Sequence, residues 1–236
     1  MLMFVSEDPT AHMATESLTT REYVFEDDKI APLTMHEDPV GTWACGIGNT
    51  IWDAGLVLSK YIEKLSSQPD QTIVKPEARV IELGSGTGLV GLVFAKCFTD
   101  AERVVLTDKA ACLPLLRKNV KENVETGPES RVVTEELDWE RLDLGGSVLA
   151  GQYDVILLSD CLWHPPLYEP LVKALSAVAG PSTMVLMAYE KRNFDEELAF
   201  FKLFSQKFAF KDVKAEEQDE RWQSEDIYVF KAWLKN

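Results

Sequence analysis

A short run of glycines between a strand and a helix constrains this chain most. Residues 80–88 read Val-Ile-Glu-Leu-Gly-Ser-Gly-Thr-Gly, the pattern of a buried strand that turns sharply into an apolar helix. Gly84, Gly86 and Gly88 leave bare backbone at the start of that helix, where a ligand can approach the N–H groups. The sequence therefore predicts a strand–loop–helix unit at the ligand edge of an α/β sheet.

The glycine spacing separates two kinds of ligand. A dinucleotide fingerprint has glycine at the first, third and sixth positions, but here the sixth position is Leu89 and the third glycine is Gly88. Glu82, two residues before the loop, suits a cationic group better than a pyrophosphate. S-adenosylmethionine carries such a group, its α-ammonium, and the loop resembles motif I of the class I methyltransferases. A dinucleotide site and an ordinary tight turn remain the alternatives.

Two further positions suit a nucleoside beside this loop. Asp108 ends the next predicted strand, where a carboxylate can accept hydrogen bonds from both ribose hydroxyls. Its alternative role is to cap the helix expected over 110–124. Trp139 follows Asp138 after the third strand, and an aromatic face with a polar neighbour suits adenine. The alternative for Trp139 is simple packing.

An acceptor group would meet the ligand at the end of the fourth strand. We expect Ser159 to line the cofactor pocket and Asp160 to orient and attract an amine. We assign Asp160 positioning, because an unperturbed aspartate is a weak base near neutral pH. Trp163 is expected to flank a lysine stem or to offer a π face to a methylated ammonium. The alternative is that Asp160 caps the following turn and Trp163 only packs.

Three weaker candidates surround these residues. Trp52 begins a helix that could cover the cofactor, or it only staples that helix. His164 could act as a base, although a loop histidine is more often solvated. The charged run 190–192 falls on the same rim and could position a substrate loop, or it is a solvated helix entry.

From residue 79 onward, strand and helix patterns alternate. Helices are predicted near 88–97, 110–124, 167–178 and 194–206, and strands near 79–83, 102–107, 131–135, 153–159, 182–189, 208–215 and 226–233. This alternation predicts an α/β, Rossmann-like fold with a mostly parallel seven-stranded sheet, an antiparallel C-terminal strand and helices on both faces. Residues 1–20 are expected to be poorly ordered, 21–78 to form a hairpin and a helix packed on the core, and 79–236 to form the core of a single domain.

Composition excludes several classes of protein. The net charge is −15, which argues against binding nucleic acid through its phosphates. Such a charge suits a basic, lysine-bearing protein segment, and the alternative is that it serves solubility alone. The four cysteines show no Cys-x-x-Cys pairing, so we expect reduced thiols and no metal site. No signal peptide or membrane-spanning run is evident, so we expect a cytoplasmic protein that can also be nuclear.

A more specific resemblance emerges from several segments together. Several segments are similar to the seven-β-strand protein lysine methyltransferases, the methyltransferase-like 21 group. They are residues 46–54 with 57–61, the loop 82–88, residues 160–161 with 167–171, and the stretches 189–192 and 224–227. Within that group the likeness is greatest to the branch that methylates valosin-containing protein. One departure is Trp163, where the family usually has Tyr or Phe, and this alters the expected lysine channel.

This resemblance implies an enzyme that transfers a methyl group from S-adenosylmethionine to a lysine ε-amine and leaves S-adenosylhomocysteine. It places the cofactor against Trp52, Glu82, Gly84, Ser85, Gly86, Gly88, Asp108, Trp139 and Ser159, and catalysis at Asp160 and Trp163. Candidate substrates are an AAA ATPase, a chaperone, a ribosomal protein or an elongation factor, and we expect a monomer without nucleic-acid or membrane partners.

Two other functions compete with this one. The first is a small-molecule or nucleic-acid methyltransferase, although adenine N6 enzymes usually carry two prolines where this chain has Cys161 and Leu162. The second is a cofactor-binding interaction module without catalysis. Transfer of a labelled methyl group to protein distinguishes both from the leading hypothesis.

Overall fold

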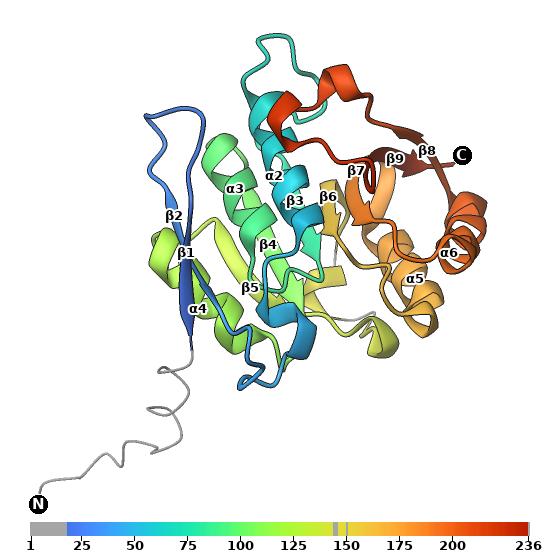
Figure 1. Ribbon diagram of the computed structural model, residues 1–236, viewed down its shortest axis with the longest axis horizontal. Coiled ribbons are helices and arrows are strands. Elements are labelled where there is room, and N and C mark those ends of the chain that lie inside the picture. Colours follow the sequence, from blue (N-terminus) through green and yellow to red (C-terminus); the bar gives the residue numbers. More distant parts are fainter. Residues whose placement is uncertain (1–17, 144–145, 150, 236) are drawn as a thin grey trace, which may run out of the picture.

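A seven-stranded sheet between two layers of helices forms the body of the protein (Figure 1). The computed structural model describes residues 18–143, 146–149 and 151–235. The strands of this sheet are β3 (Arg79–Leu83), β4 (Arg103–Asp108), β5 (Val132–Glu136), β6 (Tyr153–Ser159), β7 (Ala179–Glu190), β8 (Phe208–Asp212) and β9 (Ile227–Leu234). They lie in the order β5-β4-β3-β6-β7-β9-β8.

The sheet is parallel from β5 to β7, and β9 then runs antiparallel to both β7 and β8. This confirms the predicted fold. Glu82 of β3 lies level with Leu106 of β4 and Leu157 of β6. The carboxyl ends of the three central strands therefore meet at one edge, beside the point where the winding reverses at β3.

Both faces of the central strands are buried, which explains their nearly continuous apolar sequences. Val80 and Val155 point into a core shared with α2 (Asp53–Ser66), α3 (Leu89–Cys97) and α4 (Leu113–Asn123). The neighbouring Ile81 and Ile156 point into a second core. That core is covered by α5 (Tyr168–Val178) and α6 (Phe194–Lys207).

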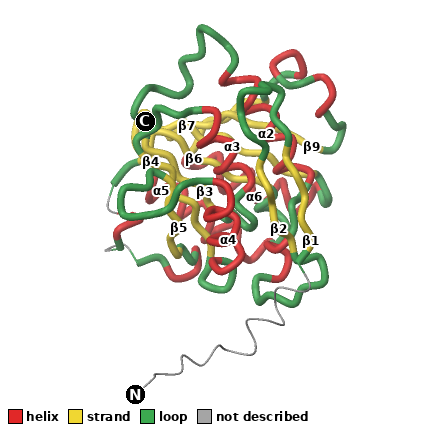
Figure 2. The backbone as a smooth tube through the Cα atoms, turned by 90° about the vertical axis from the view of Figure 1, so that its left-hand side faces the viewer, coloured by secondary structure: helices red, strands yellow, loops and turns green. Residues whose placement is uncertain are grey.

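An N-terminal hairpin forms a second, two-stranded sheet, as the sequence predicted. It pairs β1 (Thr19–Tyr23) with β2 (Leu33–Glu37) and lies apart from the main sheet (Figure 2). The amides of Asn119 and Asn123 on α4 accept the backbone N–H groups of His36 and Thr34, at 2.7 and 2.8 Å. These hydrogen bonds attach the hairpin to the helix layer.

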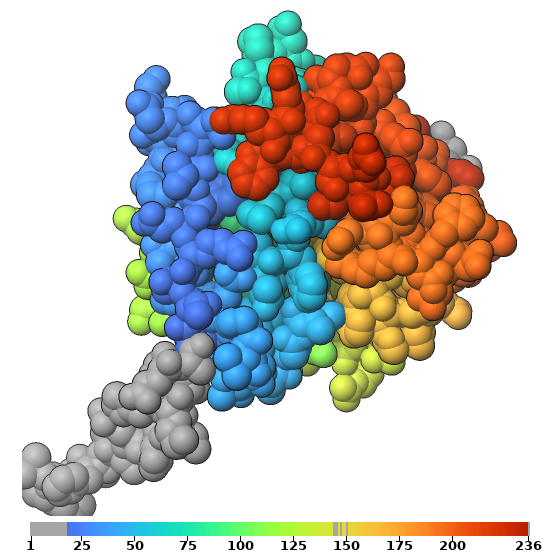
Figure 3. All heavy atoms as spheres, in the orientation of Figure 1, coloured from blue at the N-terminus to red at the C-terminus, as the bar shows by residue number. Residues whose placement is uncertain are grey.

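The C-terminal part of the chain closes over the same side. Arg221 forms an ion pair with Glu26 of the hairpin at 2.8 Å, and Lys64 of α2 donates to the carbonyl of Gln218 at 2.6 Å. Figure 3 shows this segment, in red, against the blue N-terminal region. Among the described residues, no helix is both long and apolar enough to span a lipid bilayer.

Several boundaries differ from the predictions, and two of these differences bear on the predicted order of the N-terminus and on Asp108. Thr19 and Thr20 belong to β1, although residues 1–20 were expected to be poorly ordered; residues 1–17 lie outside the described part. Helix α4 begins at Leu113 instead of residue 110, because Ala110–Cys112 form a separate turn. Asp108 is therefore not the N-cap of α4, which removes the structural alternative weighed for it.

The prediction that all four cysteines are reduced was wrong. Cys45 and Cys112 form a disulfide with their Cα atoms 4.5 Å apart, whereas Cys97 and Cys161 are free. The two bonded residues are 67 positions apart in the chain. No local spacing links them, so only the fold reveals the pair.

Candidate active site

A pocket of about 360 Å³ opens at the carboxyl ends of the central strands. Ten of the eleven predicted site residues line it: Trp52, Glu82, Gly84, Ser85, Gly86, Asp108, Trp139, Ser159, Asp160 and Trp163. Gly88 does not. It precedes α3 with a φ of 86°, and a Cβ there would lie 2.6 Å from the side chain of Leu116, so its role is structural.

The other two glycines of the loop are required by close approach. Gly84 and Gly86 have φ values of 66° and 53°, which disfavour any side chain. A Cβ on Gly84 would lie 3.0 Å from the ring of Trp139, and one on Gly86 would lie 2.9 Å from the carbonyl of Gly48. The loop is therefore a narrow backbone cradle between an aromatic ring and the segment that precedes α2.

Glu82 places a carboxyl group at the base of the pocket. It is fully buried, and its side chain accepts the Gly91 N–H at 3.2 Å. Burial raises the pKa of Glu82 to about 8, although hydrogen bonds from Ser85 and Gly91 oppose the rise. A cationic group bound beside Glu82 would favour the ionised carboxylate. The carboxyl group of Glu82 therefore favours binding of a ligand with a positive charge.

Asp108 connects the glycine loop to the end of β4. Its Oδ2 accepts the Gly86 N–H at 2.8 Å, and its Oδ1 accepts the Lys109 N–H at the same distance. Burial raises the pKa of Asp108, and these two N–H groups partly offset that effect. Each oxygen keeps a lone pair, so the carboxylate can still accept hydrogen bonds from a pair of ribose hydroxyls.

Trp139 contributes an unused hydrogen-bond donor to the pocket wall. Its indole Nε1 is buried and has no hydrogen-bond partner among the described residues. A buried indole N–H normally finds a partner. Its ring also lies against Gly84. A ligand that presents a flat ring and an acceptor atom would satisfy both features.

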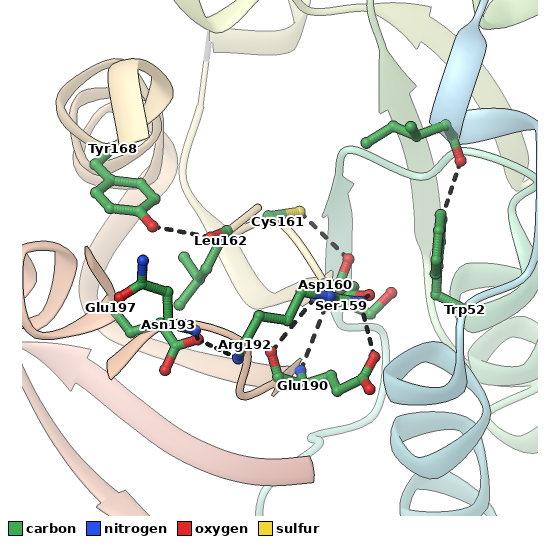
Figure 4. A network of polar contacts seen from close by, with 11 residues as sticks. Trp52, Ser159, Asp160, Cys161, Leu162, Tyr168, Glu190, Arg192, Asn193 and Glu197 are labelled. Atoms are coloured by element: carbon green, nitrogen blue, oxygen red, sulfur yellow. Dashed lines mark hydrogen bonds and ion pairs between the residues drawn. The ribbon is translucent and has the colours of Figure 1, made fainter. Parts of the chain in front are cut away.

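Asp160 lies at the mouth of the pocket in a strained backbone conformation. Its φ is 54°, which is unusual for a residue with a side chain. Its N–H donates to the Ala188 carbonyl of the neighbouring strand β7 at 2.9 Å. Its carboxylate is bound by Arg192, with both nitrogen–oxygen distances at 2.7 Å (Figure 4).

The N-terminal cap of helix α6 fixes the position of Arg192. Asn193 caps that helix by accepting the N–H groups of Asp195 and Glu196, and acidic residues fill the first turn. Glu197 accepts the backbone N–H groups of both Arg192 and Asn193, at 2.6 and 2.9 Å. The run 190–192 had been predicted either to position a substrate loop or to be a solvated helix entry, and its contacts with Asp160 were not foreseen.

Three aromatic or imidazole rings border the opening. Trp52 is 42% exposed, and its indole N–H donates to the Ile47 carbonyl at 3.0 Å. Trp163 is 45% exposed and stacks on His164, with ring centroids 5.0 Å apart. Trp163 therefore does not pack in the core. Its ring is open to solvent at the rim, and its contact with a substrate stays a prediction.

Sequence reasoning missed the cover over the glycine loop. Four residues that were not predicted also line the pocket: Cys45, Ile47, Gly48 and Cys112. Because Cys45 is bonded to Cys112, the cover is tied to the turn that follows Asp108. The sulfur atoms also lie within 4.8 Å of an Asp108 oxygen, a grouping of metal-ligand type, but the disulfide engages both. The glycines around Ile47 were the only local signal of this close approach.

Comparison with known proteins identifies the family. The lysine methyltransferase family model matches residues 29–207. The chain belongs to this family. METTL21A of Danio rerio, named a protein N-lysine methyltransferase, is 33% identical over 192 residues, which cover 81% of this chain and 79% of the relative. EFM6 of Saccharomyces cerevisiae, named a protein-lysine N-methyltransferase, is 30% identical over 80% of this chain and 82% of its own.

Solved structures agree on the fold. A ribosomal protein L11 methylase from Lactobacillus delbrueckii aligns with a TM-score of 0.54 at 14% identity, over 79% of this chain and 81% of the other. A glycopeptide N-methyltransferase complexed with sinefungin aligns with a TM-score of 0.52 at 10% identity, over 75% of this chain and 94% of the other. The fold is that of the class I methyltransferases.

The protein is therefore an S-adenosylmethionine-dependent protein-lysine methyltransferase. The pocket fits this methyl donor. Gly84 and Gly86 give a backbone cradle, Glu82 suits an ammonium, and the indole N–H of Trp139 has no acceptor among the described residues. Membership of this family excludes the alternative that the glycine loop binds a dinucleotide. The nearness to the branch that methylates valosin-containing protein stays a prediction.

Proposed function

We propose that Asp160 receives the ε-amine of the substrate lysine at the mouth of this pocket. The position of Asp160 carries the proposal. Asp160 follows Ser159, which lines the pocket, and its carboxylate lies where β6 and β7 end. S-adenosylmethionine, when bound, supplies a methyl group activated by its sulfonium. Asp160 then aligns the amine for in-line attack, and alignment is the main task of the protein in such a displacement.

The rings around the opening complete the acceptor site in this proposal. Trp163 flanks the alkyl stem of the lysine, and Trp52 shields the reacting centre from water. Both are positioned for contact with a large partner, because each is nearly half exposed at the rim. Glu82, Asp108 and Trp139 hold the donor below. A wider indole in place of the usual phenol or phenyl ring narrows the lysine channel and selects a different sequence around the lysine.

The substrate we propose is a folded protein with a basic segment next to the target lysine. The net charge of −15 favours such a segment. Elongation factor 1A is the first candidate, because a relative from Mus musculus, 32% identical over 69% of this chain and 65% of its own, is named EEF1A lysine methyltransferase 3. An AAA ATPase, a chaperone and a ribosomal protein are the next candidates.

Labelled cofactor tests this proposal directly. Lysate from cells that lack this protein is incubated with tritiated S-adenosylmethionine and wild-type enzyme, Asp160→Ala, or the control Asp70→Ala, which changes an exposed loop residue. We expect a labelled protein band with the wild type and the control, and almost none with Asp160→Ala. Mass spectrometry then assigns the lysine, and purified elongation factor 1A is tested in parallel. Absence of any labelled band with the wild type contradicts the proposal.

Two further features belong to the same proposal. The enzyme acts as a monomer, which light scattering tests by the mass in solution. It acts in the cytoplasm, with access to the nucleus, where its candidate substrates are expected. The cytoplasm keeps most thiols reduced. We therefore expect a fraction of the protein there to carry Cys45 and Cys112 as free thiols. Imaging of the tagged protein in cells tests the location.

A further inference from the structure

The Asp160 carboxylate has nearly all of its hydrogen-bonding capacity occupied. Its Oδ1 accepts Arg192 Nη1–H at 2.7 Å and the backbone N–H of Glu190 at 3.3 Å. Its Oδ2 accepts Arg192 Nη2–H at 2.7 Å. Each carboxylate oxygen has two lone pairs. Among the described residues, one acceptor position is thus left for a substrate, and it is on Oδ2.

Arg192 is itself held from several directions. Its Nη2 also donates to the Glu190 carboxylate at 2.8 Å, and its backbone N–H is fixed by Glu197. The guanidinium carbon lies 5.6 Å from the centre of a Trp52 ring. The hydrogen bond to Asp160 raises the pKa of Arg192, so the group stays a cation at every working pH. Figure 4 shows the hydrogen bonds and ion pairs that join Arg192 to Asp160, Glu190 and Glu197.

A permanent cation at this position changes which form of lysine can bind. An ammonium has no lone pair and cannot attack a methyl group. A lone carboxylate would stabilise that unreactive form, whereas a nearby positive charge disfavours it and lowers the pKa of the amine. Arg192 opposes the charge of Asp160 while it also pairs with the Glu190 carboxylate, and the sulfonium of the donor adds a second positive charge. The neutral amine can still donate one hydrogen bond to Oδ2.

We infer that Arg192 is a positioning residue that makes the acceptor site select the neutral lysine amine and directs it to Oδ2 of Asp160. This inference rests on the proposed function. The ammonium loses its proton to solvent before it enters. The nitrogen lone pair then forms the bond to the methyl carbon, the carbon–sulfur bond electrons remain on sulfur, and the methylated ammonium gives its extra proton to water.

Other titratable groups face this carboxylate from each neighbouring element. They are Glu190 from β7, Glu197 from α6, Glu82 from β3, Asp108 from β4, and Cys161 and His164 from its own segment. The Glu190 side chain pairs with the Arg192 guanidinium, and the Glu197 side chain accepts the Arg192 backbone N–H. The Coulombic influence of Asp160, Asp108 and Glu82 adds to burial in raising the pKa of Cys161, so its thiol stays neutral. Among these groups, Arg192 is the cation that contacts the Asp160 carboxylate directly.

Binding of a lysine side-chain mimic tests the inference without turnover. The probe is n-butylammonium at pH 7, titrated in the presence of S-adenosylhomocysteine and followed by tryptophan fluorescence. We expect Arg192→Met to bind the cation about tenfold more tightly than wild type, because Asp160 is then unbalanced. Arg192→Lys keeps the charge and should bind it like wild type. Arg221→Met removes a distant surface charge and serves as the matched control.

The pH dependence of labelling gives a second readout. In the lysate assay, the rise of the initial rate with pH should move about one pH unit higher in Arg192→Met than in wild type, and Arg192→Lys should restore most of the difference. Equal n-butylammonium affinities in wild type and Arg192→Met, with superimposable pH profiles, would overturn the inference. Equal tightening in Arg192→Lys would overturn it too. A wild type that labels no protein defeats the proposed function instead, and the probe titration still decides the role of Arg192.

Discussion

Replacing the buried carboxyl group at the base of the pocket should make the ligand-free protein more stable at alkaline pH. Glu82 has its pKa raised from 4.5 to about 8 because burial disfavours its charged form. The unfolded chain therefore releases this proton at lower pH than the folded protein. The free energy of unfolding is highest below pH 4.5 with respect to this group, and it falls as the pH rises to about 8.

The magnitude follows from the size of that pKa difference. Each pH unit corresponds to about 1.4 kcal/mol, so the full difference amounts to an upper limit of about 5 kcal/mol. Glu82→Gln removes the titration while keeping the shape of the side chain. The variant should match wild type near pH 5 and exceed it by several kcal/mol near pH 8.5. Urea unfolding at both pH values measures this difference.

Binding of S-adenosylmethionine should favour wild type over Glu82→Gln, the opposite of their order of stability without ligand. An ammonium beside Glu82 favours the ionised carboxylate, so Glu82→Gln should bind the donor more weakly even though it is the more stable protein alone. Glu125→Gln, at an exposed position, is the matched control and should change neither quantity. The reasoning is refuted if wild type and Glu82→Gln lose stability equally between pH 5 and 8.5, since Glu82 would then not be the group that titrates.

Three other predictions concern the walls of the pocket. Asp108→Ala should weaken donor binding by about 1–3 kcal/mol in calorimetry while the unfolding midpoint without ligand changes little; a mutant that unfolds yet keeps its affinity would make Asp108 structural. Trp163→Tyr should retain far more methyl transfer than Trp163→Ala, and equal rates would remove Trp163 from the acceptor site. Reducing the Cys45–Cys112 bond, which closes a span of 67 residues, should lower the free energy of unfolding by up to about 4 kcal/mol. It should also speed the release of sinefungin, measured by stopped-flow fluorescence. An unchanged release rate would show that the disulfide does not hold the segment around Ile47 over the glycine loop.

The fold was predictable because its signals are local. Strands β3 and β6 were predicted with their observed bounds, since each is an apolar run ended by a glycine loop or a polar residue. Helix α4 was placed three residues early, because the pattern from 110 to 112 is compatible with a helix while the chain there makes a turn. Periodicity reports which face is buried, and it does not report where a turn ends.

The pocket was predictable only in part, for a similar reason. Residues at strand ends, such as Glu82 and Asp108, could be assigned because the topology brings the ends of parallel strands together. The pairing of Asp160 with Arg192 depends on how the start of α6 is capped, and the Cys45–Cys112 bond depends on a loop that crosses the glycine cradle. Such contacts arise from tertiary packing, and no spacing in the sequence encodes them.

The most direct test of this account separates binding of the donor from transfer of its methyl group. Asp160→Ala is compared with wild type by calorimetry with S-adenosylmethionine and by labelling of the protein acceptor. The account predicts a donor affinity within a few-fold of wild type and loss of most methyl transfer, because Asp160 contacts only the acceptor. Methylation of the acceptor at close to the wild-type rate would contradict it, and the acceptor site would then have to lie at His164 or on the rim from Glu190 to Arg192.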